Sequence, residues 1–354
     1  MNNIVKLQDR ISNDSVCLIE NPLNLHYFTS SNIDTGYLLV SKENACFITD
    51  FRYIEVAEKH FENSFVSVKM QEKLSDDIKE FFDNQNGKSL LIESDYQTIS
   101  KIAFFHKITD NIVLDKTLDN IIGSLRIVKD EYELESIKNA QKITDDAFSH
   151  ILSFIKPRVC EKDLALEIEF FMRKNGAEGV SFDLITISGK NTSLPHGVPS
   201  EKLLENGDFI TMDIGCKVNG YCSDMTRTVA LGFATDEMKK VYNTVLEAQK
   251  LALKTVKSGI LASQVDKAAR DYINESGFEG CFGHATGHGV GLFIHEAPTV
   301  STKSETVLKP NMVITIEPGI YLKNKFGVRI EDMVAVTENG CYDFTKSDKN
   351  LIVL

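Results

Sequence analysis

The segment DFITMDIGCKVNGYCSDMTRTVAL, residues 208–231, decides the fold of the larger part of this chain. Two runs rich in apolar and β-branched residues flank an Asn-Gly pair, which is the strongest short signal for a β-hairpin. Pairing across a two-residue loop places Asp213 opposite Thr226. Because side chains alternate between the two faces of a strand, Asp213, Asp224 and Thr226 project from the same face. The hairpin therefore predicts two carboxylates on a diagonal, within reach of a shared ion.

The surroundings of this aspartate pair predict burial. Solvated surface aspartates are the ordinary case in proteins, but the neighbouring residues here are Ile, Met, Val and Ala. A buried pair of carboxylates is costly unless cations neutralise it. The two nearby thiols are expected to pack rather than to bind, because Cys216 points to the opposite face and Cys222 lies nearer the turn.

A glycine-rich segment, GHATGHGVGLFIHEAP at residues 283–298, holds His284, His288 and His295, three of the eight histidines in the chain. Isolated histidines are most often structural or solvated, but three in so short a glycine-rich segment indicate a site that a ligand can approach closely. The spacing of His284 and His288 occurs in helical zinc motifs, yet the glycines disfavour a regular helix. The segment is therefore not a zincin-type motif.

Two glutamates occupy strand positions in MVITIEPGIYLKNKFGVRIEDMVAV, residues 312–336. Glu317 ends an apolar strand at Pro-Gly, and Glu331 is expected inside a second apolar strand with Arg329 on the same face. Glutamates in strands are usually exposed, but strands this apolar predict burial. These charges also need a partner.

Together the three segments supply four carboxylates and one histidine. The set consists of Asp213, Asp224, His288, Glu317 and Glu331. It suits a pair of divalent cations of hard to borderline character, with Mn²⁺ favoured and Co²⁺, Fe²⁺ or Zn²⁺ as alternatives, and it differs from thiolate-rich zinc sites. Outside this set, His196 in SLPHGVP and His295 are candidate hydrogen-bond donors to an amide substrate.

The first part of the chain has a different pattern, in which short β-rich runs alternate with helical patterns. This alternation predicts a small α/β domain over residues 1–124, followed by a second domain over residues 125–354. No glycine-rich phosphate loop follows any of the runs, so nucleotide binding is not supported. The second domain begins with a long amphipathic helix, for which Asp130 and Glu133 can form a capping box. The strands expected in the first domain are Ser15–Glu20, Tyr37–Val40, Cys46–Asp50, Phe65–Met70, Ser89–Ile92 and Ile112–Leu114.

A faint internal repeat relates two parts of the second domain. Residues 155–179 align without gaps on residues 256–280, and each copy has a turn, a helix and a glycine suited to the position after a helix end. Two similar halves around a pseudo-twofold axis are therefore expected, with a site at their junction. The identical pairs are Lys156 and Lys257, Gly176 and Gly277, Glu178 and Glu279, and Gly179 and Gly280.

Composition excludes several classes of function. The 354 residues include 39 Lys and Arg against 51 Asp and Glu, a formal charge of −12, which argues against nucleic acid or an anionic membrane as a partner. No apolar run reaches the roughly 18–20 residues of a membrane span, and the first residues lack the pattern of a secretory signal. Seven cysteines without paired short spacings are typical of reduced thiols. We therefore expect a cytoplasmic enzyme.

Four stretches carry a resemblance to a known family: MDIGCKVNGYCSDMTRT, TGHGVGLFIHEAP, ITIEPGIY and GVRIED. They resemble the pita-bread metallopeptidases of the creatinase/aminopeptidase fold. The whole chain is similar to the short bacterial Xaa-Pro dipeptidases and aminopeptidases, the prolidase-like enzymes. The resemblance implies an α+β protein in which an N-terminal α/β creatinase-like domain controls substrate access or dimerisation. The C-terminal pita-bread domain would be pseudo-twofold, with helices around a curved antiparallel sheet.

The resemblance also implies metal ligation by the five residues of the set. They would bind two metal ions per chain, with Asp224 and Glu331 bridging them. Glu317 would in addition act as a proton shuttle. Thr226 and Arg329 would orient the ligands.

The same resemblance assigns the remaining histidines to the substrate. His196 and His295 would contact the scissile peptide, and His284 would line the substrate cavity. The implied reaction is hydrolysis of the bond between an N-terminal residue and a following proline, in small peptides, by a homodimer. Dipeptidase and aminopeptidase activity both stay open, as do the native metal and the preferred first residue.

Three alternative functions share this fold. A methionine aminopeptidase has the same types of metal ligand, but the N-terminal domain and the sequence motifs SDMTRT and GVRIED argue against this function. A creatinase-like amidinohydrolase does not use a metal pair. A non-catalytic binding protein has no reason to keep costly buried carboxylates together.

Overall fold

The computed structural model describes residues 3–354. The chain divides into two compact units after Arg126, at the end of helix α6 (Thr117–Arg126). The boundary expected after residue 124 lies inside this helix. None of the helices in the described part of the chain has the length and apolar character needed to cross a bilayer.

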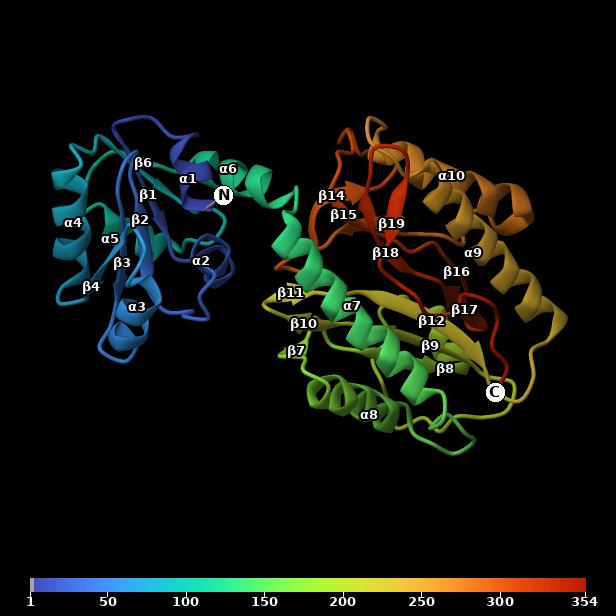
Figure 1. The fold of residues 1–354 in the computed structure, drawn as a ribbon. Helices are drawn as coiled ribbons and strands as arrows, with labels where there is room; N and C mark the ends of the chain where they lie inside the picture. The colour runs from blue at the N-terminus through green and yellow to red at the C-terminus, as the bar shows by residue number, and fades with distance from the viewer. Residues whose placement is uncertain (1–2) are drawn as a thin grey trace. The chain divides into compact units, whose positions relative to one another are not determined.

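The first unit is built on one mixed sheet in the order β4-β3-β2-β1-β5-β6 (Figure 1). Strand β2 is antiparallel to β1 and β3, whereas β3–β4, β1–β5 and β5–β6 are parallel pairs. All six expected strands are present, with ends that differ by one residue at most. They are β1 (Ser15–Ile19), β2 (Tyr37–Val40), β3 (Ala45–Thr49), β4 (Val66–Met70), β5 (Ser89–Ile92) and β6 (Ile112–Val113).

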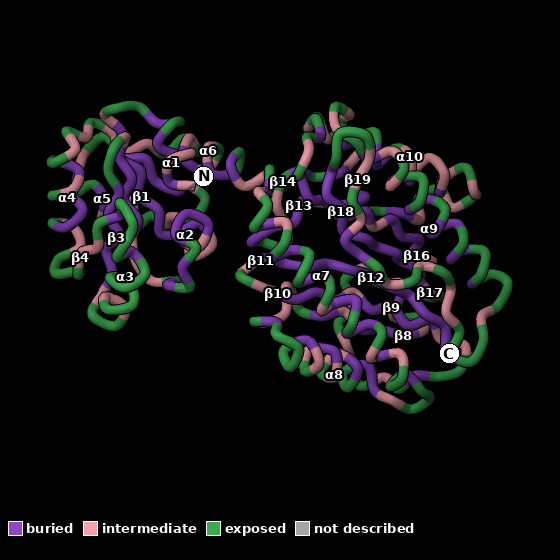
Figure 2. Tube along the Cα trace, in the orientation of Figure 1, coloured by how far each residue is buried: buried purple, intermediate pink, exposed green. Residues whose placement is uncertain are grey.

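Short helices pack against this sheet, and its central strands are buried (Figure 2). Helix α4, for example, buries Ile78 and Phe82 and exposes its charged face, as an amphipathic helix on a sheet does. The helices are α1 (Asn3–Gln8), α2 (Pro22–Thr29), α3 (Ile54–Phe61), α4 (Leu74–Asn84), α5 (Ile99–Phe105) and α6.

The second unit contains two helix pairs and a set of antiparallel strands. The predicted capping box is present at the start of α7, where the side chains of Asp130 and Glu133 each accept the other's backbone N–H. The α-helices are α7 (Glu131–Ile151), α8 (Glu161–Lys174), α9 (Asp236–Thr255) and α10 (Ala262–Ile273), and a 3₁₀ turn covers Gly189–Ser193. In Figure 1 the pair α7–α8 and the pair α9–α10 flank different groups of strands.

The strands of the second unit form antiparallel sheets in the orders β12-β9-β8, β11-β10-β7, β14-β13-β15-β18-β19 and β16-β17. The first two sheets use β7 (Gly179–Val180), β8 (Ile185–Ser188), β9 (Phe209–Ile214), β10 (Cys216–Val218), β11 (Tyr221–Cys222) and β12 (Met225–Ala230). The others use β13 (Gly287–Gly289), β14 (Glu296–Val300), β15 (Val313–Ile316), β16 (Gly319–Leu322), β17 (Phe326–Arg329), β18 (Asp332–Val336) and β19 (Cys341–Asp343).

The hairpin of residues 208–231 has the predicted register but not the predicted continuity. Asp213 is paired with Thr226 across β9 and β12, and the same pairing continues at the turn between β10 and β11. The ladder is interrupted at Gly215, where a Cβ would lie 2.1 Å from the carbonyl oxygen of Ser223. Only glycine permits this approach. At this interruption the chain leaves the sheet that contains β9 and β12 and enters the sheet that contains β10 and β11. Asp224 therefore lies outside the paired strands.

The internal repeat is visible in the backbone. Gly176 and Gly277 occupy equivalent places after α8 and α10, and both have the positive φ that favours glycine. An antiparallel bridge precedes each helix, at Cys160 in the first half and at Leu261 in the second. After α10 the chain continues through a wider π-type turn, Asn274–Phe278. The helices, the glycines that follow them and the bridges that precede them therefore recur in both halves, as expected for a pseudo-twofold domain.

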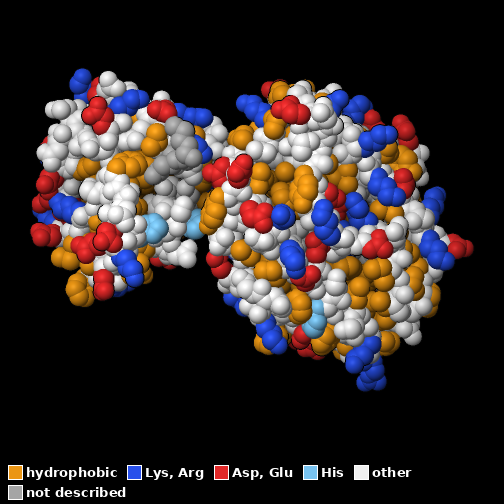
Figure 3. Space-filling model, in the orientation of Figure 1, with side chains coloured by type: hydrophobic (Ala, Val, Ile, Leu, Met, Phe, Trp, Pro, Cys, Tyr) orange, Lys and Arg blue, Asp and Glu red, His pale blue; other side chains and the backbone are white. Residues whose placement is uncertain are grey.

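The surface shows no accumulation of one charge sign on the face drawn in Figure 3. Lys and Arg side chains alternate with Asp and Glu side chains over both units. The face drawn therefore shows no large basic patch.

Candidate metal centre

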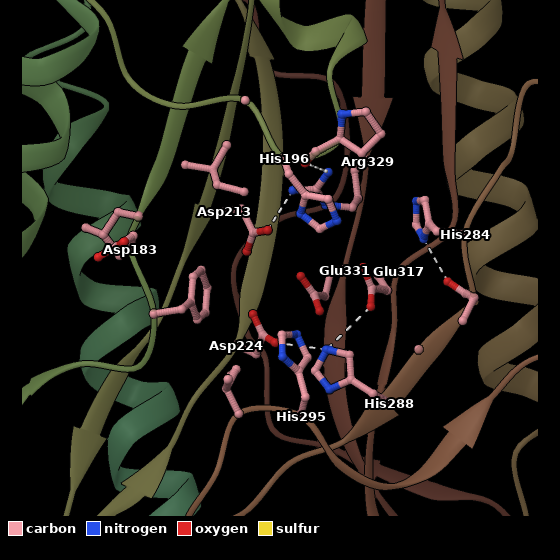
Figure 4. Close-up of a pocket in the computed structure, with 18 of the residues that line it drawn as sticks. Asp183, His196, Asp213, Asp224, His284, His288, His295, Glu317, Arg329 and Glu331 are labelled. Atoms are coloured by element: carbon pink, nitrogen blue, oxygen red, sulfur yellow. Dashed lines mark hydrogen bonds and ion pairs between the residues drawn. The ribbon is translucent and has the colours of Figure 1, made fainter.

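A cavity of about 520 Å³ lies in the second unit, and the predicted site residues converge on it (Figure 4). They come from segments far apart in the chain, between β8 and β18. The predicted residues that line the cavity are His196, Asp213, Asp224, His284, His288, His295, Glu317, Arg329 and Glu331. Thr226 lies beside the cavity and contacts Glu331.

The acidic residues lie where strands are interrupted. Asp213 is near the end of β9, and Asp224 stands between β11 and β12. In the other half, Glu317 follows β15 and Glu331 precedes β18, so the expectation that Glu331 lies inside a strand is wrong. The reason is that in each half the chain leaves the main strand pair to form a short inner hairpin. This hairpin is β10–β11 in the first half and β16–β17 in the second. Each hairpin is therefore flanked by two carboxylates.

Three side chains already have the spacing of a metal site. Asp224, His288 and Glu331 each offer a ligand atom, and these atoms lie within 4.8 Å of one another. Nε2 of His288 is 3.5 Å from Oδ2 of Asp224 and 3.5 Å from Oε1 of Glu317. Oδ1 of Asp213 is buried and has no hydrogen-bond partner in the described part of the chain. An unpaired buried carboxylate oxygen beside such a cluster fits a bound cation.

Burial dominates the electrostatics of the cluster. It raises the pKa of Asp224 and of Glu331 well above the usual range, and repulsion from the neighbouring carboxylates adds to the effect. Burial also raises the pKa of Glu317 to about 7 and lowers the pKa of His288 to about 4. A neutral imidazole among carboxylates that resist ionisation is an arrangement that a divalent cation would stabilise.

Hydrogen bonds fix the orientation of His288. Its Nδ1 lies 3.1 Å from the carbonyl oxygen of Gly289, so Nδ1 carries the proton and Nε2 is left with its lone pair toward the carboxylates. Thr315, which the sequence analysis missed, accepts the backbone N–H of His288 and donates to Glu317. The strand β15 thus supports two candidate ligands at once.

Thr226 and Arg329 form the predicted support of the acidic residues. The Thr226 hydroxyl donates to Oε2 of Glu331 at 2.7 Å and accepts from Nε of Arg329 at 3.0 Å. Nη2 of Arg329 is 2.6 Å from Oδ2 of Asp213. These bonds leave the other oxygen of Asp213 directed to the cluster.

Tyr321 connects this support to His284, and the sequence analysis did not identify it. Its hydroxyl lies 2.9 Å from Nε2 of His284 and 3.0 Å from Nη1 of Arg329. Because Nδ1 of His284 lies 2.7 Å from the carbonyl oxygen of Ala285, Nδ1 carries the proton and the tyrosine donates to Nε2. Both ring nitrogens of His284 are therefore engaged, and this histidine lines the cavity without a free donor.

A second network lies behind the ligand strands. Arg227 is buried and donates to Asp332 and to the carbonyl oxygen of the candidate ligand Glu331. It also donates to the carbonyl oxygens of Ser347 and Asp348. This arginine fixes the backbone at Glu331 from the side opposite the cavity. Nothing in the local sequence pattern indicates the role, because every partner except a neighbouring carbonyl is distant in the chain.

Comparison with known families gives two matches that together span most of the chain. Residues 135–338 match the description "Metallopeptidase family M24". Residues 6–128 match the "Creatinase/Prolidase N-terminal domain". The first match lies within the second compact unit, and the second match covers most of the first unit and extends two residues beyond its end at Arg126.

Individual relatives are similar over nearly their full length. The chain is 39% identical to a protein named Xaa-Pro dipeptidase from Pyrococcus furiosus, over 99% of this chain and 98% of the relative. Among solved structures, an Xaa-Pro dipeptidase from Bacillus anthracis is 41% identical with a TM-score of 0.93, covering 99% of both chains. An X-Pro aminopeptidase from Thermotoga maritima is 35% identical with a TM-score of 0.91, covering 98% of this chain and 100% of the other.

Proposed function

The chain belongs to metallopeptidase family M24, and from this premise we propose that it is a dinuclear exopeptidase that hydrolyses the bond between an N-terminal residue and a following proline. The proposal rests above all on one observation. The cavity joins four carboxylates, of which Asp224 and Glu331 are buried, to one neutral histidine, and one carboxylate oxygen has no partner in the described residues. Relatives with both Xaa-Pro dipeptidase and X-Pro aminopeptidase names support the substrate class.

The residues that would hold two divalent cations are Asp213, Asp224, His288, Glu317 and Glu331. Asp224 and Glu331 are the two carboxylates of the close cluster with His288, so all three would hold a cation. The oxygen-rich set favours Mn²⁺, with Co²⁺, Fe²⁺ or Zn²⁺ as alternatives. Bound cations of this kind supply an activated water and a Lewis acid for the carbonyl group.

The protein's own groups would bind the peptide and move the proton. His196 and His295 lie at the cavity and have exposed rings that can donate to the scissile peptide. Glu317 would carry a proton to the proline nitrogen, which is a poor leaving group without one. A carboxyl group with a pKa of about 7 is suited to accept and return a proton near neutral pH.

The setting of the enzyme is part of the proposal. All seven cysteines are unpaired, which is consistent with a reducing cytoplasm. The homodimer and the role of the first unit in substrate access or dimerisation are carried over from the family resemblance.

The proposed activity predicts a clear order of substrates. With Mn²⁺ present, peptides with proline in second position, such as Leu-Pro, Ala-Pro-Ala and Arg-Pro-Pro, are expected to be hydrolysed, and Met-Ala-Ser is not. The readout is release of the first residue, followed by chromatography. EDTA should abolish the activity, and Mn²⁺ should restore it. Preference for Met-Ala-Ser would favour a methionine aminopeptidase, and activity insensitive to EDTA would exclude the metal mechanism.

Tyr321→Phe is expected to lower kcat/KM by roughly tenfold without loss of the fold. The change removes two hydrogen bonds, each worth about 0.5–1.5 kcal/mol, and loosens both His284 and Arg329. The measurement is steady-state hydrolysis of Ala-Pro-Ala, with Tyr342→Phe as the matched control because Tyr342 is 44% exposed. A rate within twofold of the unsubstituted enzyme would contradict the positioning role.

A further inference from the structure

Acidic side chains outnumber basic ones among the residues that line the cavity. Five carboxylates line it, and among its lining residues, all within the described part of the chain, Arg329 is the only Lys or Arg. The Arg329 side chain is 4% exposed. Its three nitrogens are engaged by Asp213, Thr226, Tyr321 and the carbonyl oxygen of Pro195. This guanidinium is therefore not available to an incoming anion.

The mouth of the cavity carries a negative charge. Asp183 is exposed, lines the cavity, and has no hydrogen bond or ion pair within residues 3–354. It lies on the loop before β8, and Figure 4 shows it on the side of the cavity away from His284. The other exposed lining residues include Val198, which is 79% exposed, and Thr299. Neither of these carries a charge. The two other exposed lining residues, His196 and His295, are the proposed donors to the scissile peptide, so no exposed lining residue carries a permanent positive charge.

A free Xaa-Pro dipeptide differs from a longer peptide in one group near the scissile bond. The proline carboxylate of the dipeptide lies two bonds from the scissile nitrogen, so it must sit in the same cavity. In a longer peptide, or in a dipeptide amide, the same place holds a neutral amide. Two divalent cations and their four ligand carboxylates cancel in formal charge, so they offer no net counter-charge to this group.

We propose that the site takes peptides that continue beyond the proline in preference to free Xaa-Pro dipeptides, and that Asp183 is a specificity-determining residue for this choice. This inference rests on the proposed function. An anionic group at the cavity is opposed by the carboxylate of Asp183 and meets no accessible Lys or Arg among the lining residues, whereas a neutral amide avoids both costs. The relatives carry both dipeptidase and aminopeptidase names, so the comparisons do not make the choice.

The test compares two substrates that differ in one atom. Values of kcat/KM are measured for Ala-Pro and Ala-Pro-NH₂ with the Mn²⁺-loaded full-length enzyme. We expect the amide to be favoured by tenfold or more. Asp183→Asn should reduce this preference by roughly three- to tenfold, the size of one partly screened like-charge interaction. Asp163→Asn, the same charge change on an exposed part of α8 away from the cavity, should leave the preference unchanged.

The outcomes separate this inference from the proposed function. Hydrolysis of Ala-Pro at least as fast as Ala-Pro-NH₂ would overturn the inference and leave the Xaa-Pro peptidase intact. No hydrolysis of either substrate, or of Ala-Pro-Ala, would overturn the proposed function itself. A strong preference for the amide that persists in Asp183→Asn would overturn the role of Asp183. Thermal melting of the variants checks that both remain folded.

Discussion

Glu317→Gln is expected to remove nearly all turnover while the protein folds normally. Glutamine has almost the same shape and can keep the hydrogen bond from Thr315, but it cannot accept and return a proton. General acid–base catalysis contributes about 10²–10⁴-fold, so kcat should fall by at least that factor. The measurement is kcat for Ala-Pro-Ala at saturating Mn²⁺, with Glu338→Gln as the control because Glu338 is exposed.

Metal content distinguishes the two roles proposed for Glu317. Loss of turnover with two metal ions still bound per chain, determined by elemental analysis, would support the proton shuttle. Loss of one ion would show that the ligand role dominates. A kcat near that of the unsubstituted enzyme would refute both roles.

Asp224→Asn is expected to change thermal stability in opposite directions with and without metal. Burial and neighbouring carboxylates raise the pKa of Asp224 in the folded protein. A carboxyl group with a raised folded pKa binds more protons in the folded state, so the metal-free protein loses stability as pH rises above the unfolded pKa. Asparagine does not ionise, so the variant does not lose folding stability in this way. At pH 8 in EDTA the variant should therefore melt a few degrees higher than the unsubstituted protein.

Addition of Mn²⁺ should reverse this order. The unsubstituted protein should gain stability by binding the ion, whereas the variant lacks one of the proposed ligands and should gain little. Its activity should be lost. Asp163→Asn serves as the control, because it removes an exposed aspartate and should follow the unsubstituted protein in both conditions. An Asp224→Asn protein that is less stable in EDTA, or that is stabilised normally by Mn²⁺, would contradict the assignment.

The register of the ligand hairpin could be predicted from the sequence because a two-residue Asn-Gly turn leaves no freedom in the pairing. Asp213 and Thr226 are paired as that turn requires. The break at Gly215 was not predicted, because it depends on the close approach of the backbone at Ser223, which alternation of side chains does not reveal. The same limitation explains the wrong strand position of Glu331.

Residues that act through distant partners were missed. Tyr321 and Arg227 lie inside two of the quoted stretches, ITIEPGIY and MDIGCKVNGYCSDMTRT, but their roles arise only when strands from both halves meet. In the first unit, the strands were recognised from their composition, whereas helix α2 was not predicted. Its signals were present, since Asn21 caps the helix and Pro22 occupies its first turn. Short helices of this kind have too few residues for periodicity to be informative.

The placement of one carboxylate pair beside each hairpin has a consequence for the mechanics of the second unit. Asp224 belongs to the first half of the repeat, and His288 and Glu331 belong to the second. A single ion held by all three is a non-covalent cross-link between the halves. Opening of either half would then release the ion, so we expect metal occupancy to raise the cooperativity with which the halves unfold. Loss of metal would remove catalysis and one of the ties between the two halves, leaving direct contacts such as the ion pairs Arg227–Asp332 and Arg329–Asp213.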